Sequence, residues 1–138
     1  MGLGVDGAAS NESGRMLEEA HQALLFARAV GGPTALSTRT ALELATLGGA
    51  RLLGRADEIG SIEVGKYADL VLWDLRTLGH RGIDDPVAAL VLGEVPPVKC
   101  SWVGGRSVVR DGQMLTVDTD QIAAAVQAAH HGLMGRVR

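Results

Sequence analysis

The first third of the chain shows helical spacing of apolar residues, introduced by a short apolar run. Met1 to Asp6 is apolar and glycine-rich, which predicts the end of a buried strand. From Met16 to Val30 apolar residues recur every three or four positions, as on one face of a helix. Ser13 is the expected N-cap of this helix, and Ser37 is that of a second helix over 38–47.

A glycine pair and a change of spacing mark the end of this helical part. Gly48-Gly49 should break or bend the second helix. From about Arg55 onward, short apolar runs bounded by turn residues predict strands instead. A turn-rich segment, 59–66, leads into a predicted strand from Ala68 to Trp73. Further on, Asp84-Asp85-Pro86 predicts the start of a short helix, because proline at the first helical position gives up no needed hydrogen bond.

Alternating apolar and polar residues then predict an antiparallel unit that ends in a helix. The predicted strands 98–102 and 106–110 flank Gly104-Gly105, a pair suited to a two-residue hairpin turn. A third strand is expected over 113–117, and Asp118 is expected to cap the closing helix. The apolar face of this helix consists of Ile122, Val126, Ala129 and Leu133.

Composition excludes several classes of partner. The 138 residues are 46% hydrophobic, which is enough for one folded domain. A net charge of −3 and few aromatic residues argue against nucleic acid as a partner. There is no apolar run long enough to cross a membrane and no signal peptide pattern at the N-terminus. The single cysteine, Cys100, fits a reducing compartment, so we expect a cytoplasmic protein.

Two glycine patterns match nucleotide-binding motifs in letters but not in context. Gly2-x-Gly4-x-x-Gly7 matches the dinucleotide fingerprint, yet no helix begins within it. Gly60-x-x-x-x-Gly65-Lys66 matches a phosphate loop, but Lys66 runs into a predicted strand where a helix should follow. We interpret the second pattern as a turn with a solvated lysine. A nucleotide-binding module therefore stays open only as an alternative.

Few side chains suggest catalysis by their pattern. The four histidines lack the spacing of a zinc site, so we interpret all of them as solvated. Asp6 is different, because a carboxylate at the C-terminal tip of a strand lies where α/β folds keep their chemistry. The competing interpretation is that Asp6 caps the following loop through the amides of Ala8 or Ala9.

Several longer stretches resemble the amidohydrolase superfamily. Gly2 to Ser13 resembles its last barrel strand and the loop after it, and Thr40 to Gly54 is similar to the helix that follows. Ile59 to Val71 resembles the segment leading into the family's small β-sandwich, and 85–91 and 103–112 extend the likeness. The resemblance is strongest to guanine and 8-oxoguanine deaminases and triazine hydrolases. It covers nearly the whole chain but only the C-terminal third of the family.

The resemblance implies an α/β fold in which this chain is a C-terminal fragment of a (β/α)8 metallo-dependent hydrolase. Residues 1–54 would be the remnant of the barrel, with its last strand, loop and helices. Residues 55–138 would be part of a composite antiparallel β-sandwich with a closing helix. The family's other metal ligands, all histidines, would lie before Met1, so we expect the fragment to be inactive alone and to retain no metal.

The resemblance also implies a reaction and a role for Asp6. A zinc ion, or iron in some members, would activate water for attack on a ring carbon that carries an amino group. Asp6 would ligate the metal, accept a proton from that water and help to pass it to the leaving amine. Asn11 would either bind the heterocyclic substrate or order the loop, and exposed apolar faces suggest a homo-oligomer. The remaining alternative is a self-standing β-rich interaction domain.

Overall fold

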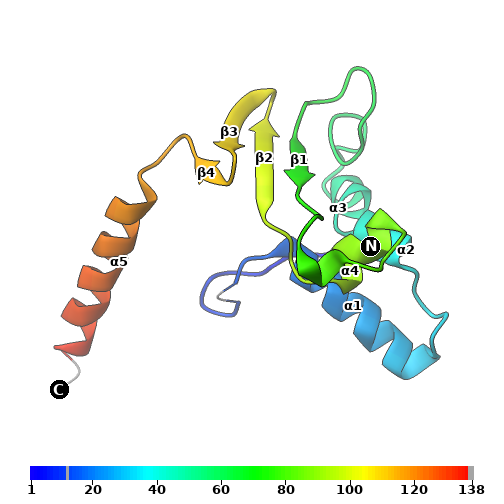
Figure 1. Cartoon of the computed structure of the whole chain (residues 1–138), viewed down its shortest axis with the longest axis horizontal. Helices are drawn as coiled ribbons and strands as arrows, with labels where there is room; N and C mark the ends of the chain where they lie inside the picture. The colour runs from blue at the N-terminus through cyan, green and yellow to red at the C-terminus, as the bar shows by residue number, and fades with distance from the viewer. Residues whose placement is uncertain (12, 137–138) are drawn as a thin grey trace.

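A computed structural model describes residues 1–11 and 13–136 of the chain. Glu12, which belongs to the stretch that resembles the last barrel strand and loop, lies outside the described residues. Figure 1 shows the order of the elements from the N-terminus to the C-terminus. They are α1 (Met16–Gly31), α2 (Thr38–Leu44), α3 (Leu47–Leu52), β1 (Leu70–Trp73), a 3-10 helix (Leu78–His80), α4 (Pro86–Leu92), β2 (Val98–Val103), β3 (Arg106–Arg110), β4 (Gln113–Met114) and α5 (Thr119–Met134).

The strands form one antiparallel sheet in the order β1-β2-β3-β4. Leu70 pairs with Trp102 at one end of β1, and Cys100 pairs with Arg110 between β2 and β3. The predicted hairpin turn is confirmed, because Gly104 and Gly105 have φ angles of 55° and 78°. Positive φ at both central residues is what a type I′ turn requires and what glycine supplies without strain.

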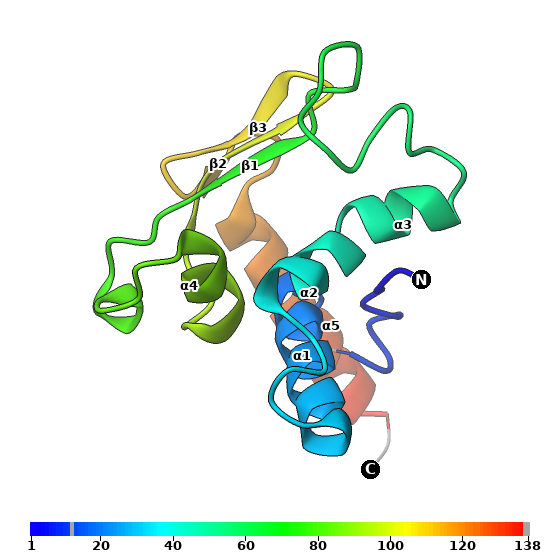
Figure 2. The ribbon, with the colours of Figure 1, turned by 90° about the vertical axis from the view of Figure 1, so that its right-hand side faces the viewer.

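The hydrophobic core lies where α1, α2 and α4 meet, on the helical side of the molecule (Figure 2). Ala20 and Leu24 of α1, Ala41 of α2 and Val91 of α4 are almost completely buried. Two of these four residues are alanines, which let the helix backbones approach closely. Leu3 packs against this cluster from the N-terminal segment, and its amide donates to the carbonyl oxygen of Leu44 at 3.1 Å. The start of the chain is therefore held against the helices.

Three of the four predicted helix caps are confirmed. The Thr40 amide donates to Ser37 Oγ, the Val87 amide to Asp85 Oδ1, and the Gln121 amide to Asp118 Oδ1. The fourth prediction is wrong, because α1 begins after Arg15 without a side-chain cap. Ser13 instead donates its amide and its hydroxyl to Asn11 Oδ1.

The expected break at Gly48-Gly49 is also wrong, because both glycines lie inside α3. The helical path is interrupted at Thr46, whose hydroxyl donates to the carbonyl oxygen of Leu42 at 2.8 Å. The glycines serve packing instead. A Cβ on Gly48 would lie 2.6 Å from the carbonyl oxygen of Met1, so only glycine lets the start of the chain approach this helix.

Two strand predictions fail in whole or in part. Among the described residues, Met1 to Asp6 forms no ladder, because the four-stranded sheet lies elsewhere and the segment meets α2 and α3 instead. The strand expected over 113–117 is only Gln113–Met114. After the Leu115 amide donates to the carbonyl oxygen of Val108, the chain leaves β3 and turns into α5.

The closing helix α5 extends away from the rest of the molecule (Figure 1). None of its residues is buried, although it carries the predicted apolar face. No helix among residues 1–11 and 13–136 is long and apolar enough to cross a membrane. The division into 1–54 and 55–138 stays a prediction, and α4 of the second part contributes Val91 to the core formed with α1 and α2.

The expectation that all four histidines are solvated is wrong for two of them, His80 and His21. His80 is only 4% exposed, and its Nε2–H donates to the carbonyl oxygen of Glu94 at 2.7 Å while Nδ1 accepts from the Thr77 hydroxyl. This tautomer follows because a carbonyl oxygen only accepts. His21 donates from Nδ1 to the carbonyl oxygen of Val91 at 2.8 Å. Both rings therefore fasten the α4 region to its neighbours.

Candidate functional site

Asp6 lies where the extended N-terminal segment turns into the loop before α1. Its φ angle is 59°, a left-handed backbone conformation that aspartate tolerates better than most residues. The side chain is exposed, and Oδ1 accepts a hydrogen bond of 2.7 Å from the Gly7 amide. No contact among the described residues engages Oδ2. The expected capping bonds from Ala8 or Ala9 are replaced by this bond from the adjacent residue.

A short turn follows Asp6 and fixes the course of the loop. The amides of Ser10 and Asn11 donate to the carbonyl oxygen of Gly7 at 2.9 and 3.0 Å. Asn11 then uses both ends of its side-chain amide within the chain: Nδ2 donates to Glu19 Oε1 at 2.6 Å, and Oδ1 accepts from Ser13. Asn11 thus orders the loop, and substrate binding by Asn11 stays a prediction.

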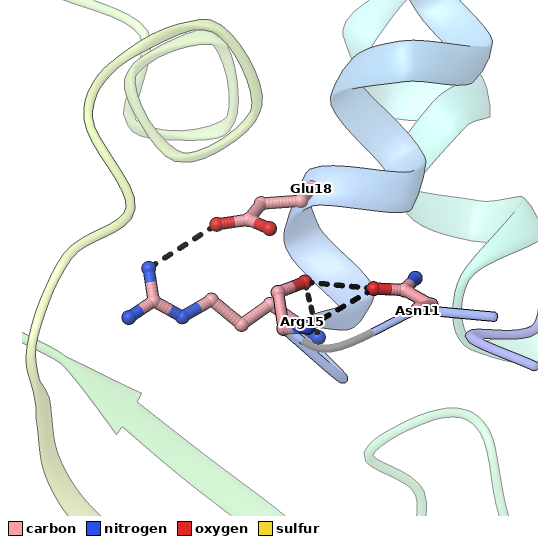
Figure 3. A network of polar contacts seen from close by, with 4 residues as sticks. Asn11, Arg15 and Glu18 are labelled. Carbon is pink, nitrogen blue, oxygen red and sulfur yellow. Dashed lines mark hydrogen bonds and ion pairs between the residues drawn. The ribbon is translucent and has the colours of Figure 1, made fainter. Parts of the chain in front are cut away.

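The first turn of α1 completes this polar network (Figure 3). Arg15 and Glu18 form an ion pair of 3.1 Å beside the Asn11–Ser13 contacts. The nearby Ser13 side chain lowers the pKa of Glu18, and the Arg15 guanidinium lowers it further. Glu18 and Glu19 both lie in the first turn of α1, where carboxylates interact favourably with the helix dipole. The loop after Asp6 is therefore tied to a helix end suited to negative charge.

The donor set around Asp6 fits one ligand of a metal centre. A carboxylate oxygen is a normal zinc ligand, and Asp6 Oδ2 is exposed and without a partner among the described residues. A catalytic zinc site normally takes three or more protein ligands. Within residues 1–11 and 13–136, no group of three or more histidine, cysteine or acidic side chains is placed to hold a metal. Among the residues that the structure describes, Asp6 is thus a single donor without companion ligands.

The structure gives the two glycine motifs a packing role. A Cβ on Gly2 would lie 2.8 Å from the amide nitrogen of Gly49, and one on Gly60 would lie 2.7 Å from the Ala50 side chain. The interpretation of Lys66 as solvated is wrong, because its side chain is only 10% exposed. Its ammonium group donates to the Ala56 carbonyl and to Ser61, and pairs with Glu63. These contacts leave it no free donor for a phosphate.

A large apolar groove separates β1 and β2 from the helices, and sequence reasoning missed it. Its volume is about 1270 Å³, more than most small-molecule pockets hold, and Asp6 does not line it. Tyr67, Trp73 and Trp102 lie along it with Leu70 and Leu72 of β1. The alternating pattern of the strands indicated that one face of the sheet is covered. It did not indicate that a groove would remain between this face and the helices.

Comparison with known proteins supports a single family. The amidohydrolase family model matches residues 1–108. An 8-oxoguanine deaminase from Pseudomonas aeruginosa is 42% identical over 134 residues, which is 97% of this chain and 30% of the relative. A 5-methylthioadenosine/S-adenosylhomocysteine deaminase from Desulforudis audaxviator is 42% identical over 124 residues, covering 88% of this chain and 29% of the relative.

Solved structures agree with the sequence relatives. An adenosine deaminase from Xanthomonas campestris with bound zinc aligns with a TM-score of 0.90 and 36% identity, over 97% of this chain and 31% of that one. An atrazine chlorohydrolase from Arthrobacter aurescens complexed with zinc aligns with a TM-score of 0.83 and 32% identity, over 92% and 29%. The chain spans less than a third of each of these proteins. By sequence and by fold, it belongs to the amidohydrolase family.

Proposed function

We propose that the chain is the C-terminal part of a metal-dependent amidohydrolase that deaminates a purine-like ring. The observation that carries the proposal is the exposed Asp6 carboxylate, which begins an anchored turn and keeps one oxygen without a partner among the described residues. The names of the relatives support hydrolytic deamination as the reaction. We favour 8-oxoguanine or guanine as the substrate, because the match to an 8-oxoguanine deaminase combines 42% identity with coverage of 97% of the chain.

In this proposal, Asp6 both binds the metal and moves a proton. When bound, zinc supplies a Lewis acid that makes water a better nucleophile near neutral pH. Iron is the alternative metal. As the water oxygen attacks the ring carbon, Asp6 accepts a proton from the water. Asp6 then transfers this proton to the exocyclic nitrogen, the carbon–nitrogen bond breaks, and ammonia leaves. The second proton of the water moves to the ring nitrogen beside the attacked carbon, so that a ring carbonyl remains.

The rest of the site belongs, in this proposal, to segments that complete a (β/α)8 barrel around Asp6. Residues 1–54 contribute its helices and the segment Met1 to Asp6, which is in no ladder among the described residues and would become the last strand on pairing with those further segments. Residues 55–138 contribute to a composite β-sandwich. The open groove beside β1 and β2 supports this view, because a groove lined by Tyr67, Trp73 and Trp102 is suited to contact further protein. We place the protein in the cytoplasm, where a free thiol such as Cys100 persists.

We expect the isolated 138-residue chain to release no ammonia from guanine, 8-oxoguanine or amino-triazines. The reason is that one carboxylate does not hold a zinc ion that normally takes three or more protein ligands. A chimera in which these 138 residues replace the matched C-terminal region of the Pseudomonas aeruginosa 8-oxoguanine deaminase should release ammonia in a zinc-dependent way.

The measurement is ammonia release from each substrate by the chain, the chimera and the chimera after chelation. Adenosine and 5-methylthioadenosine complete the panel, because relatives carry those names. Turnover by the isolated chain that is lost on chelation would contradict the expected inactivity of the fragment. A folded, zinc-loaded chimera that deaminates none of these substrates would contradict the proposed function.

A further inference from the structure

Glu19 reaches from α1 to the loop that follows Asp6. Its Oε1 accepts a hydrogen bond of 2.6 Å from Asn11 Nδ2 across eight positions of sequence. Both side chains are half-buried. A hydrogen bond to an ionised carboxylate is shorter and about twice as strong as one between neutral groups. Among the described contacts of the loop's side chains, this one therefore ties the loop most firmly to the helix.

Asn11 connects this contact to the turn beside Asp6. Its backbone amide donates to the carbonyl oxygen of Gly7 at 3.0 Å, as does the Ser10 amide at 2.9 Å. The Gly7 amide in turn donates to Asp6 Oδ1. A continuous series of hydrogen bonds and short chain segments thus runs from Glu19 through Asn11 to the carboxylate of Asp6.

The two ends of this series differ in how firmly they are held. Glu19 precedes Ala20, which is fully buried in the core, and Leu24 one turn later is fully buried as well. Gly7 to Ser10, by contrast, is exposed along its whole length. The rigid end of the series is therefore α1, and the Glu19–Asn11 bond transmits its position to the exposed turn.

We propose that Glu19 is a positioning residue: through Asn11 it fixes the turn after Asp6 and, with it, the direction of the Asp6 carboxylate. The inference rests on the proposed function for its catalytic meaning. Asp6 has a φ angle of 59°, which aspartate tolerates at some energetic cost, so the hydrogen bonds of the turn help to keep it in this conformation. Loss of the Glu19–Asn11 bond releases that constraint.

Hydrogen exchange on the 138-residue chain tests the bond without any need for activity. Glu19→Ala should speed exchange of the Ser10 and Asn11 amides by about tenfold, because their acceptor Gly7 is no longer held. Glu19→Gln keeps an acceptor oxygen, so its exchange rates at these two amides should lie between those of Glu19→Ala and those of the unmodified chain. Glu43→Ala removes a carboxylate that pairs with Arg51 on the other helices and should change neither amide. Equal exchange in Glu19→Ala and the unmodified chain would overturn the proposal.

Kinetics of the chimera test the consequence for catalysis. A misplaced catalytic group costs up to about a hundredfold in rate, so Glu19→Ala should lower kcat by about 10- to 100-fold with KM nearly unchanged. Glu19→Gln should recover part of the loss, and Glu43→Ala should match the unmodified chimera. A change in KM alone would overturn the positioning role. An inactive chimera would contradict the proposed function instead, and the exchange measurement would still decide whether Glu19 holds the turn.

Discussion

Asp6→Asn should remove most of the activity of the chimera while leaving its fold intact. An amide does not accept the proton of the attacking water, and loss of a general acid–base group costs about a hundred- to ten-thousandfold in rate. The fold should survive because asparagine, like aspartate, tolerates the φ angle of 59° at this position. Ammonia release, circular dichroism and zinc content measured on the same preparation separate the loss of chemistry from the loss of metal.

Asp111→Asn is the matched control for this substitution. Asp111 is an exposed aspartate with a φ angle of 48° in the turn between β3 and β4, so the same change is made in the same backbone region. The control should keep the rate of the unmodified chimera. Near-normal turnover of a zinc-loaded Asp6→Asn chimera would contradict the catalytic role and would mean that Asp6 only stabilises its loop.

The isolated chain should associate with itself at micromolar concentration. Its α5 helix has no buried residue, and Ile122, Val126 and Leu133 are 48%, 64% and 62% exposed. With Ala129 these residues follow at intervals of four, three and four positions, which is the spacing of a coiled-coil seam. Antiparallel pairing with a second copy brings Asp118 and Asp120 of one helix toward Arg136 of the other. An uncovered helix of this length is only marginally stable in water.

Sedimentation of two charge variants tests this expectation. Val126→Glu places a carboxylate in the apolar seam and should shift the chain to monomer. Ala124→Glu adds the same charge on the opposite face of α5 and should leave the association unchanged. The self-association prediction would be wrong if the unmodified chain sedimented as a monomer. It would also be wrong if both variants associated as the unmodified chain does, because the seam would then not be the contact.

Local patterns predicted the elements whose causes are local. Ser37, Asp85 and Asp118 cap helices because a side chain and an amide two or three positions away suffice. Gly104-Gly105 makes a hairpin because the turn itself demands positive φ. These features depend on no distant partner, so they can be predicted from the local sequence alone.

The predictions that failed concern residues whose role depends on partners distant in the sequence. Gly48 is glycine because Met1 packs on it, and His80 is buried because Glu94 offers a carbonyl oxygen. Lys66 is covered because its ammonium group donates hydrogen bonds to the Ala56 carbonyl oxygen and to Ser61 Oγ. Each partner is set by tertiary packing, which neither periodicity nor residue type reveals.

The candidate site shows the same division. Pattern alone singled out Asp6, and only the resemblance gave it a metal and a substrate. Glu19 was missed because helical spacing places it on a polar face, where a carboxylate is ordinary. Its partner Asn11 lies in a loop without regular geometry, so no spacing rule links the two.

The central claim is that Asp6 is a zinc ligand, and a crystal structure of the zinc-loaded chimera measures this directly. Anomalous scattering at the zinc edge locates the metal independently of any assumption about its ligands. Our account predicts an Asp6 carboxylate oxygen about 2.0–2.2 Å from the zinc, the normal distance for such a ligand. A fully occupied zinc site with the Asp6 side chain turned away, bonded only to amides of its own loop, would contradict it.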